Sequence, residues 1–310
     1  MLPDESDRSE MRPSLSWFAA AVLLQAIAVF SLPAYGHDDL FEMGLGACAS
    51  AQGGCLGSLS GDLSLLFYDP AGLVAIQALA AETTYGLLPD GYAVTDFTLG
   101  GKGFGIGISS LEFGDVSITD EFGIPIGVTE LRSTAVMIGA AWCPGGSFGD
   151  GIRWVNHLSL GLLLKSHWMT TPGDEPSIGL SADVSFALAK RWSAGPLESA
   201  TLSFIQRNLI PEAHSPGGSH YSTEVRGGIQ FRWDLDLNCY VRSRGDVGLG
   251  IAWRPLRQLT LRAGVRILEP TVFTYGVTLA LGQFKADASV SMHPALTDEF
   301  RLEFGYEYRQ

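Results

Sequence analysis

The sequence predicts an all-β protein: a 14-stranded antiparallel transmembrane β-barrel with an N-terminal hatch in its lumen. From about residue 77 to the end, apolar and polar side chains alternate with the period of a β-strand. Only 17% of the residues are charged and 38 of 310 are glycine, so the apolar character is spread over many short segments. About 40 residues before the first strand show no sustained alternation, so they cannot be part of the barrel wall.

Residues 1–36 are typical of a secretory signal peptide. Trp17 to Leu32 is an apolar run, and the small-residue triplet Ala34-Tyr35-Gly36 follows it. The segment before Met11 is acidic, which is the wrong sign for such a leader, so we expect translation to start at Met11. An uncleaved anchor helix is the alternative, although the run is shorter than the ~20 residues that span a bilayer.

Strands are expected wherever the alternation is sustained. Near the C-terminus, for example, Phe300 and Phe304 alternate with Arg301 and Glu303. The expected strands are 79–88, 92–100, 103–113, 129–142, 154–166, 178–190, 199–207, 221–233, 234–243, 246–254, 258–268, 272–281, 283–292 and 299–308. Their number is even, as in single-chain bacterial outer-membrane barrels.

A secreted soluble sandwich or barrel would also alternate. The strands here follow one another as a meander, and the longer polar loops, at 114–128, 166–177 and 207–220, follow alternate strands. The connections at 143–153 and 190–198 are long for periplasmic turns. Aromatic residues near the strand ends suit a lipid–water boundary. We therefore expect export to the bacterial outer membrane, with membrane lipid and the barrel-assembly machinery as partners.

The segment 37–76 is predicted to be a hatch, and 77–310 the barrel. Irregular backbone cannot face lipid, because its unpaired amides find no water there. Cys48 and Cys55 lie close enough in sequence to form a disulfide in an oxidising compartment, and this question stays open. The segment before Cys48 also looks like a lipoprotein cleavage site, although acidic residues separate it from the apolar run.

Two stretches of the hatch carry a resemblance. Met43 to Ala51 and Phe67-Tyr68-Asp69-Pro70-Ala71-Gly72-Leu73 resemble the hatch of the FadL-like outer-membrane fatty-acid transporter superfamily, including its PorV- and PorQ-type relatives. Their hatch commonly carries Asn-Pro-Ala-Gly-Leu, and Asp69 stands in place of that Asn. Residues 248–255, 259–265 and 301–308 are similar to the last strands of the same group.

The resemblance implies a 14-stranded barrel with a luminal hatch, through which long-chain fatty acids or other hydrophobic molecules diffuse. It makes six residues of the motif candidate hatch and ligand-binding residues: Phe67, Tyr68, Asp69, Pro70, Ala71 and Gly72. In the family, a kink in an early strand opens the wall sideways. The candidates for it are Gly101, Gly103, Gly105, Gly107 and Gly114; alternatively, these glycines form a hairpin turn and accommodate the hatch.

Arginines on the polar faces are expected to point into the lumen. Arg226, Arg262 and Arg266 could hold a carboxylate head group, because a guanidinium matches its geometry. The alternative is that these arginines pair with luminal acids and fix the hatch.

The sequence excludes several other functions. A net charge of −13 argues against a nucleic-acid partner. We find no metal-ligand spacing, Walker loop or nucleophile elbow, so we expect no metal, no cofactor and no enzymatic activity. Passive outer-membrane transport is the favoured function. The alternative is a PorV-like barrel without transport that acts as a secretion scaffold, a shuttle or a surface adhesin. An apolar tunnel would favour transport, and a polar, plugged lumen would favour a scaffold.

Overall fold

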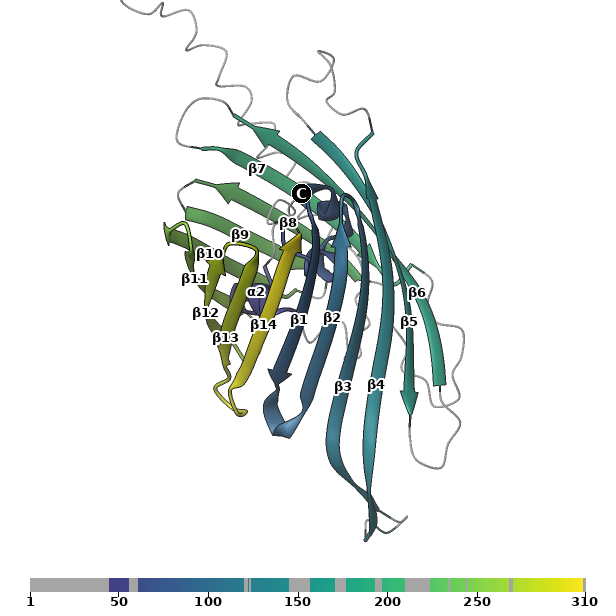
Figure 1. Ribbon diagram of the computed structural model, residues 1–310. Coiled ribbons are helices and arrows are strands. Elements are labelled where there is room, and N and C mark those ends of the chain that lie inside the picture. Colours follow the sequence, from purple (N-terminus) through teal and green to yellow (C-terminus); the bar gives the residue numbers. More distant parts are fainter. Residues whose placement is uncertain are drawn as a thin grey trace, which may run out of the picture.

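The computed structural model describes residues 45–55, 61–119, 122, 124–144, 157–170, 177–192, 197–209, 224–233, 235–243, 245–267 and 270–308. Within them, fourteen antiparallel strands form a closed barrel, in which each strand pairs with its sequence neighbours and β1 pairs with β14 (Figure 1). The predicted signal peptide and start at Met11 lie outside the described residues.

The barrel follows the chain once around. Its strands are β1 (Leu79–Leu87), β2 (Ala93–Gly101), β3 (Phe104–Thr119), β4 (Pro125–Trp142), β5 (His157–Thr170), β6 (Ser177–Arg191), β7 (Ser199–Arg207), β8 (Glu224–Arg232), β9 (Leu235–Arg242), β10 (Val247–Leu256), β11 (Leu259–Ile267), β12 (Val272–Leu281), β13 (Phe284–Met292) and β14 (Glu299–Tyr308). The predicted fold class and strand number are confirmed.

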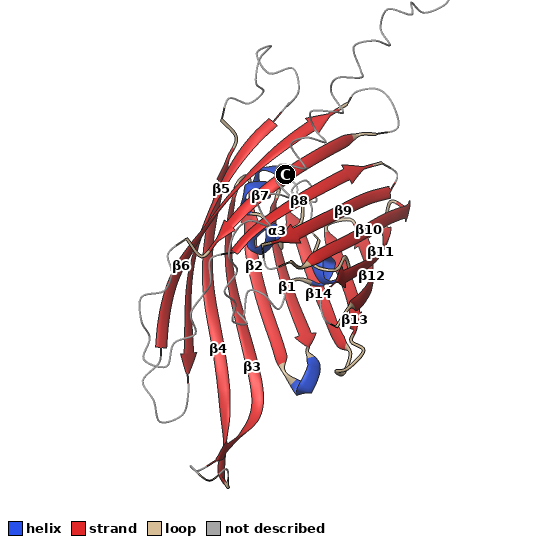
Figure 2. Ribbon diagram, turned by 180° about the vertical axis from the view of Figure 1, so that it is seen from behind, coloured by secondary structure: helices blue, strands red, loops and turns tan. Residues whose placement is uncertain are grey.

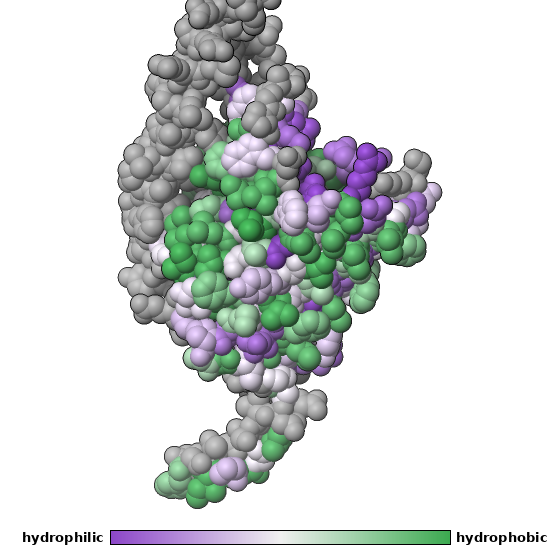
Figure 3. Space-filling model, turned by 90° about the vertical axis from the view of Figure 1, so that its left-hand side faces the viewer, coloured by the Kyte–Doolittle hydropathy of each residue, from purple (hydrophilic) through white to green (hydrophobic). Residues whose placement is uncertain are grey.

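The apolar set of each alternation faces outward. In β14, Phe300 and Phe304 are 39% and 58% exposed, whereas Arg301 and Glu303 between them are 0% and 1% exposed. The exposed apolar side chains form the lipid-facing surface that a membrane barrel needs, and the ionic ones line the interior. Figure 3 shows one side of the molecule, where apolar residues cover much of the described surface and hydrophilic residues gather toward its edges.

Strands β3 and β4 extend well beyond their predicted bounds. β3 continues to Thr119 and β4 begins at Pro125, so most of the expected loop 114–128 is a hairpin that projects beyond the rest of the barrel, at the end opposite the C-terminus (Figure 1). The β3–β4 register shifts between Glu112 and Asp115, where Gly114 has a φ of 61°. This irregularity interrupts the period of two, which is why the sequence pattern ended the strand too early.

Several aromatic residues share one end of the barrel. Even-numbered strands of a meander end on the same side, and there Trp142 closes β4, Trp192 follows β6, Trp233 follows β8, and Tyr306 lies near the end of β14. Phe284, at the start of β13, packs against Tyr306 with ring centroids 5.2 Å apart. This arrangement is typical of an aromatic girdle at a lipid–water boundary.

The hatch lies inside the barrel (Figure 2). It contains the short helices α2 (Ala47–Ser50) and α3 (Leu65–Tyr68) and the 3-10 helix η2 (Pro70–Ala75); a further 3-10 helix, η3 (Pro89–Gly91), forms the turn between β1 and β2. In the described part of the chain, no helix is long and apolar enough to cross a membrane.

Candidate functional site

One half of the hatch is apolar and packs on the inner face of the wall. Leu66, Phe67 and Leu73 belong to a buried cluster that includes Met137 of β4 and Leu163 of β5. The remaining buried members of the cluster are Leu45, Cys48, Ala49, Leu63, Leu65, Tyr68, Ile76, Leu88, Val94, Leu111 and Ala135. On this side the luminal face departs from the polar-inward rule, and it presents an apolar surface to the hatch.

The Asp-Pro-Ala-Gly-Leu motif rests directly on the wall. The backbone N–H of Ala71 donates to Oγ of Ser185 in β6 at 2.7 Å. A side chain at Gly161 of β5 would place its Cβ 2.2 Å from Ala71 N and 2.5 Å from the carbonyl carbon of Pro70. Only glycine therefore lets η2 approach β5 this closely.

Hydrogen bonds from the wall fix the residues on either side of the motif. Arg207 at the end of β7 donates through Nη2 to the carbonyl oxygen of Phe67 at 2.7 Å. Asp69 is buried, and its backbone N–H donates to the carbonyl of Leu65 at 2.9 Å, which ends α3. The six predicted hatch residues are therefore all buried in the lumen, in contact with β3 to β7 or with one another.

The turn after α2 packs on the opposite wall. Gly53 N donates to Oγ1 of Thr274 in β12 at 2.9 Å, and Nδ2 of Asn238 in β9 donates to Oε1 of Gln52 at 2.7 Å. A Cβ at Gly264 of β11 would lie 2.3 Å from the carbonyl carbon of Gln52. At this position, too, glycine lets the hatch backbone approach the wall backbone closely.

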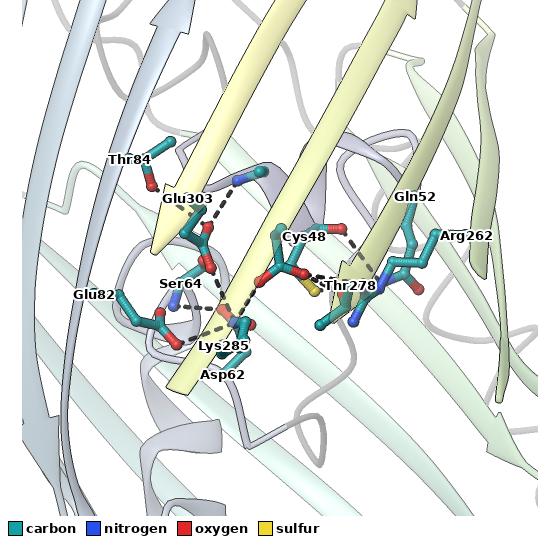
Figure 4. A network of polar contacts seen from close by, with 12 residues as sticks. Cys48, Gln52, Asp62, Ser64, Glu82, Thr84, Arg262, Thr278, Lys285 and Glu303 are labelled. Carbon is teal, nitrogen blue, oxygen red and sulfur yellow. Dashed lines mark hydrogen bonds and ion pairs between the residues drawn. The ribbon is translucent and has the colours of Figure 1, made fainter. Parts of the chain in front are cut away.

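An ionic network joins the hatch to β1, β12, β13 and β14 (Figure 4). The ammonium group of Lys285 lies 2.6 Å from Asp62, 3.1 Å from Glu82, 3.1 Å from Asp287 and 2.9 Å from Glu303. The carboxylate oxygens of Asp62, Glu82 and Glu303 all lie within 4.8 Å of one another, a spacing that suits a metal ion. Lys285 is within 3.1 Å of all three, so its ammonium supplies the positive charge that a metal would bring.

Asp62 is the hatch residue in this network. Burial alone would raise the pKa of its carboxyl group, but the charge of Lys285 and hydrogen bonds from Lys285 and Ser64 outweigh burial and hold the pKa below its usual value. Ser64 N donates to Oδ1 of Asp62 at 2.9 Å. Glu303 reaches a second part of the hatch, because its Oε2 accepts a 2.8 Å hydrogen bond from Ala47 N.

The three arginines predicted to contact a head group occupy different surroundings. Arg226 is buried against the hatch and donates to the carbonyl oxygen of Gly54. Arg262 pairs with Asp287 at 3.2 Å and also donates to Thr278. Arg266 lies half-buried on β11. These contacts agree with the alternative in which the arginines fix the hatch or pair with luminal acids; contact with a head group stays a prediction.

The five candidate kink glycines do not act together. Gly101 and Gly103, with φ of 155° and 85°, belong to the turn between β2 and β3. Gly105 and Gly107 lie beneath Leu66, whose methyl groups a Cβ would approach to 3.2 and 3.1 Å. The β2–β3 ladder is continuous from Phe104 to Glu112, and the first irregularity of β3 comes at Gly114. These positions agree with the alternative in which the glycines form a hairpin turn and accommodate the hatch. A sideways opening at these glycines stays a prediction.

Both hatch cysteines are free and buried. Cys48 accepts a hydrogen bond from Nε2 of Gln52 at 3.8 Å and belongs to the apolar cluster, whereas Cys55 lines a cavity beside Tyr240. Burial raises the pKa of both thiols, so they remain protonated at neutral pH. The structure therefore contains no bridge between them, and Cys48 lies in the lumen.

Cavities lie on both sides of the described wall. One of about 20 Å³ lies in the lumen beside Asp69, and one of about 570 Å³ is an apolar depression on the outer face of β8 to β12, lined by residues such as Leu249, Ile251 and Phe273. The luminal cavity is far too small for a hydrophobic cargo. Within the described residues the hatch occupies the lumen, which is neither an open apolar tunnel nor a wholly polar plug.

Sequence reasoning did not identify Asp62, Ser185 and Arg207 as site residues, nor the partners of Lys285. Lys285 follows Phe284, whose side chain is on the outer face, so the period of two places Lys285 on the luminal face. The alternation does not indicate which hatch residue Lys285 contacts, and Asp62 is 223 positions away in the sequence.

Comparison with solved structures places this architecture. A FadL homologue from Pseudomonas aeruginosa superimposes with a TM-score of 0.51 at 11% identity, covering 85% of this chain and 98% of that one. The chain has the FadL-type barrel fold. The toluene transporter TodX from Pseudomonas putida matches the FadL-type fold with a TM-score of 0.50 at 11% identity, covering 90% of this chain and 99% of TodX. These matches do not support the suggested relation to PorV- and PorQ-type proteins. No family model and no curated protein matches the sequence.

Proposed function

We propose that the protein is a passive outer-membrane channel for hydrophobic small molecules, with long-chain fatty acids as the first candidate cargo. The observation that carries this proposal is the apolar sector of the lumen, where Leu66, Phe67 and Leu73 pack against β3, β4 and β5. A barrel that needs only a fixed plug could line its lumen with polar groups throughout. An apolar surface behind a removable hatch instead offers a path to molecules that avoid water.

The hatch must move in this proposal, because it fills the described lumen. Its described contacts with the FadL-type wall are all non-covalent, namely hydrogen bonds, one ionic network and the apolar packing of Leu66, Phe67 and Leu73, and its helices are only four to six residues long. Cargo would enter from the side of the projecting β3–β4 hairpin, displace the hatch as a whole and leave toward the periplasm or into the membrane. No catalytic step is involved.

A reversible lock on the hatch tests this proposal. Oγ of Ser50 in α2 lies 3.2 Å from Oγ of Ser291 in β13, so cysteines at both positions can be joined with little movement. In a Cys48→Ala background, the oxidised pair Ser50→Cys and Ser291→Cys should abolish uptake, and a reducing agent should restore it. Each single cysteine variant serves as the control and should behave as the parent.

Uptake is measured with labelled oleate and labelled toluene in a Gram-negative host that lacks its own fatty-acid channel. Uptake of oleate above the empty-vector level, lost on locking, supports the proposal. If only toluene uptake rises, the cargo is an aromatic hydrocarbon. If neither rises in cells that contain the folded barrel, the channel function is wrong, and the ion-paired hatch indicates the alternative, a barrel that serves as a scaffold, shuttle or adhesin.

A further inference from the structure

A buried polar cluster lies on the luminal face of β5 and β6, where β7 ends. It consists of Lys165 in β5, Ser181 and Asp183 in β6, and Asn208 directly after β7, and none of the four is more than 7% exposed. Lys165 stands opposite Ser181 in the β5–β6 register. Its Nζ lies 2.8 Å from Oδ1 of Asp183 and 2.7 Å from Oδ1 of Asn208. An amine, a carboxyl group and a carboxamide are therefore in contact away from water.

The backbone holds Asn208 in this cluster. Its φ of 52° is in the left-handed region, which asparagine adopts more readily than most residues. Its backbone N–H donates to Oδ1 of Asp183 at 2.9 Å, and the N–H of Leu209 donates to the carbonyl oxygen of Ala182 at 2.8 Å. The chain thus turns back onto β6 after β7, and the turn carries the carboxamide of Asn208 to the end of the Lys165 side chain.

The carboxamide of Asn208 is polarised by two donors. Its Oδ1 accepts hydrogen bonds from Nζ of Lys165 and, at 3.1 Å, from Oγ of Ser181. Donors at a carbonyl oxygen stabilise the negative charge that forms there when a nucleophile attacks the carbon. The carbonyl carbon is one bond of about 1.2 Å from its oxygen. A modest rotation of the two side chains therefore turns the contact with Oδ1 into an approach of Nζ to Cγ.

Asp183 is placed to remove the protons that keep Lys165 unreactive. Burial of an ion pair costs the hydration of both charges. Transfer of one proton over the 2.8 Å from Nζ to Asp183 leaves an uncharged amine and an uncharged carboxyl group, so the interior then contains neither charge. An uncharged lysine amine is a nucleophile, and a neighbouring base is the usual means of activating one.

We propose that Lys165 and Asn208 form an isopeptide bond in the folded protein, with Asp183 as the catalytic base and acid. The bond between Nζ and Cγ of Asn208 forms, and the bond between Cγ and Nδ2 breaks. Two protons pass from Nζ through the carboxylate of Asp183 to Nδ2, which leaves as ammonium, and the carboxylate is regenerated. The reaction needs no oxidant and no cofactor. Its product joins β5 covalently to the end of β7, and the assignment is independent of the cargo.

The mass of the protein before and after folding tests the proposal. The four residues are neighbours only in the fold, so the unfolded full-length chain from inclusion bodies should be unmodified. After refolding in detergent, its intact mass should fall by the mass of one ammonia molecule. Trypsin should then release residues 154–190 joined to residues 208–226, because the amide at Lys165 prevents cleavage there.

Two outcomes of this measurement would overturn the proposal. A folded barrel, identified by its heat-modifiable migration on a gel, that keeps the mass of the unfolded chain contains no such bond. A loss of one water molecule, with Lys165 joined to Asp183 in the tryptic digest, would show that the acceptor is the carboxyl group and that the assignment of Asn208 is wrong.

Variants test the role of each group in barrels that migrate as folded. Lys165→Met and Asn208→Ala remove the two bonded groups, so neither should lose ammonia. Asp183→Asn should also keep the full mass, because asparagine cannot accept the protons of Nζ. Formation of the bond in Asp183→Asn at the rate of the parent would contradict the catalytic role of Asp183.

Ser181→Ala tests the polarised carbonyl by rate. The bond should still form after refolding, but about tenfold or more slowly, because one donor to the developing negative charge is lost. The matched control is Asn238→Ala, which removes another buried luminal carboxamide, one that contacts Gln52 of the hatch. This control should lose ammonia at the rate of the parent. An equal rate in Ser181→Ala and the parent would contradict attack at the Asn208 carbonyl as described.

Discussion

The closest approaches between hatch and wall occur at single glycines, and one of them gives a sharp prediction. Gly161→Ala places a methyl group 2.2 Å from the backbone nitrogen of Ala71, which cannot yield like the end of a flexible side chain. Overpacking of this kind typically costs about 1–3 kcal/mol. We expect faster hydrogen exchange in residues 65–76, while the barrel remains folded by its heat-modifiable migration on a gel. The control is Gly127→Ala in β4, where the added methyl meets nothing within 4 Å. Unchanged hatch exchange in Gly161→Ala would contradict this packing.

The ammonium group of Lys285 gives a second prediction at this scale. Lys285→Met leaves Asp62, Glu82, Asp287 and Glu303 without their shared cation, and the loss of one partner of a buried pair costs about 3–5 kcal/mol. The free energy of unfolding in urea and detergent should fall by about 3 kcal/mol at pH 7. Lys102→Met, in the exposed turn between β2 and β3, should have no effect.

The parent and Lys285→Met should respond differently to mild acid. In the parent, the pKa of Asp62 is below its ordinary value, so its stabilising contribution is complete at neutral pH and is lost only in strong acid, as the pH falls through that lowered value. In Lys285→Met, burial without the cation raises the pKa of the same group, so protonation at mildly acidic pH should restore part of the stability. Urea unfolding at pH 7 and pH 5 distinguishes the two; a parallel loss of stability in both proteins would refute this role for Lys285.

At the scale of the elements, the projecting β3–β4 hairpin is separable from the barrel. Beyond Gly114 its strands pair only with each other, and its described tip carries exposed apolar residues, among them Phe122, Ile124 and Ile126. We expect that a deletion joining Asp115 to Glu130 through a short turn leaves a folded barrel by gel migration. In the proposed function it lowers uptake at low cargo concentration, because an apolar capture surface is lost. Full uptake by the shortened protein would exclude the hairpin from capture.

The strands could be predicted from the sequence, whereas the docking of the hatch could not. Alternation is a local property, so the sequence alone predicts which face of the strand carries Phe300, Arg301 and Glu303. Lys285 likewise reveals that it points inward, but its contact with Asp62 depends on the curvature of the wall and the path of the hatch. The motif at Asp69 to Leu73 indicated that the segment is a hatch. Its contacts with Gly161 and Ser185 depend on the tertiary structure, and the local alternation does not predict them.

For the whole molecule, folding into lipid vesicles can test whether the apolar faces of the strands contact lipid. Ile251 lies in the middle of β10 with its side chain outward, and arginine at the midplane of a barrel wall costs about 2–4 kcal/mol. Ile251→Arg should therefore destabilise the barrel folded in lipid vesicles by about 2–4 kcal/mol. Val128→Arg, in the projecting hairpin, should change its stability by less than about 1 kcal/mol. Equal costs at both positions would contradict the proposed position of the membrane.

The pairing of β1 with β14 has a consequence for biogenesis. Strand β1 gains its second partner only when β14 is available, and Ala47 contacts Glu303 across 256 positions of sequence. Contacts of such long range form slowly, because the loop they close is long. The hatch therefore gains these contacts only after β14 is in place, and a factor that assists assembly has to shield the unpaired edge of β1 and the undocked hatch until then.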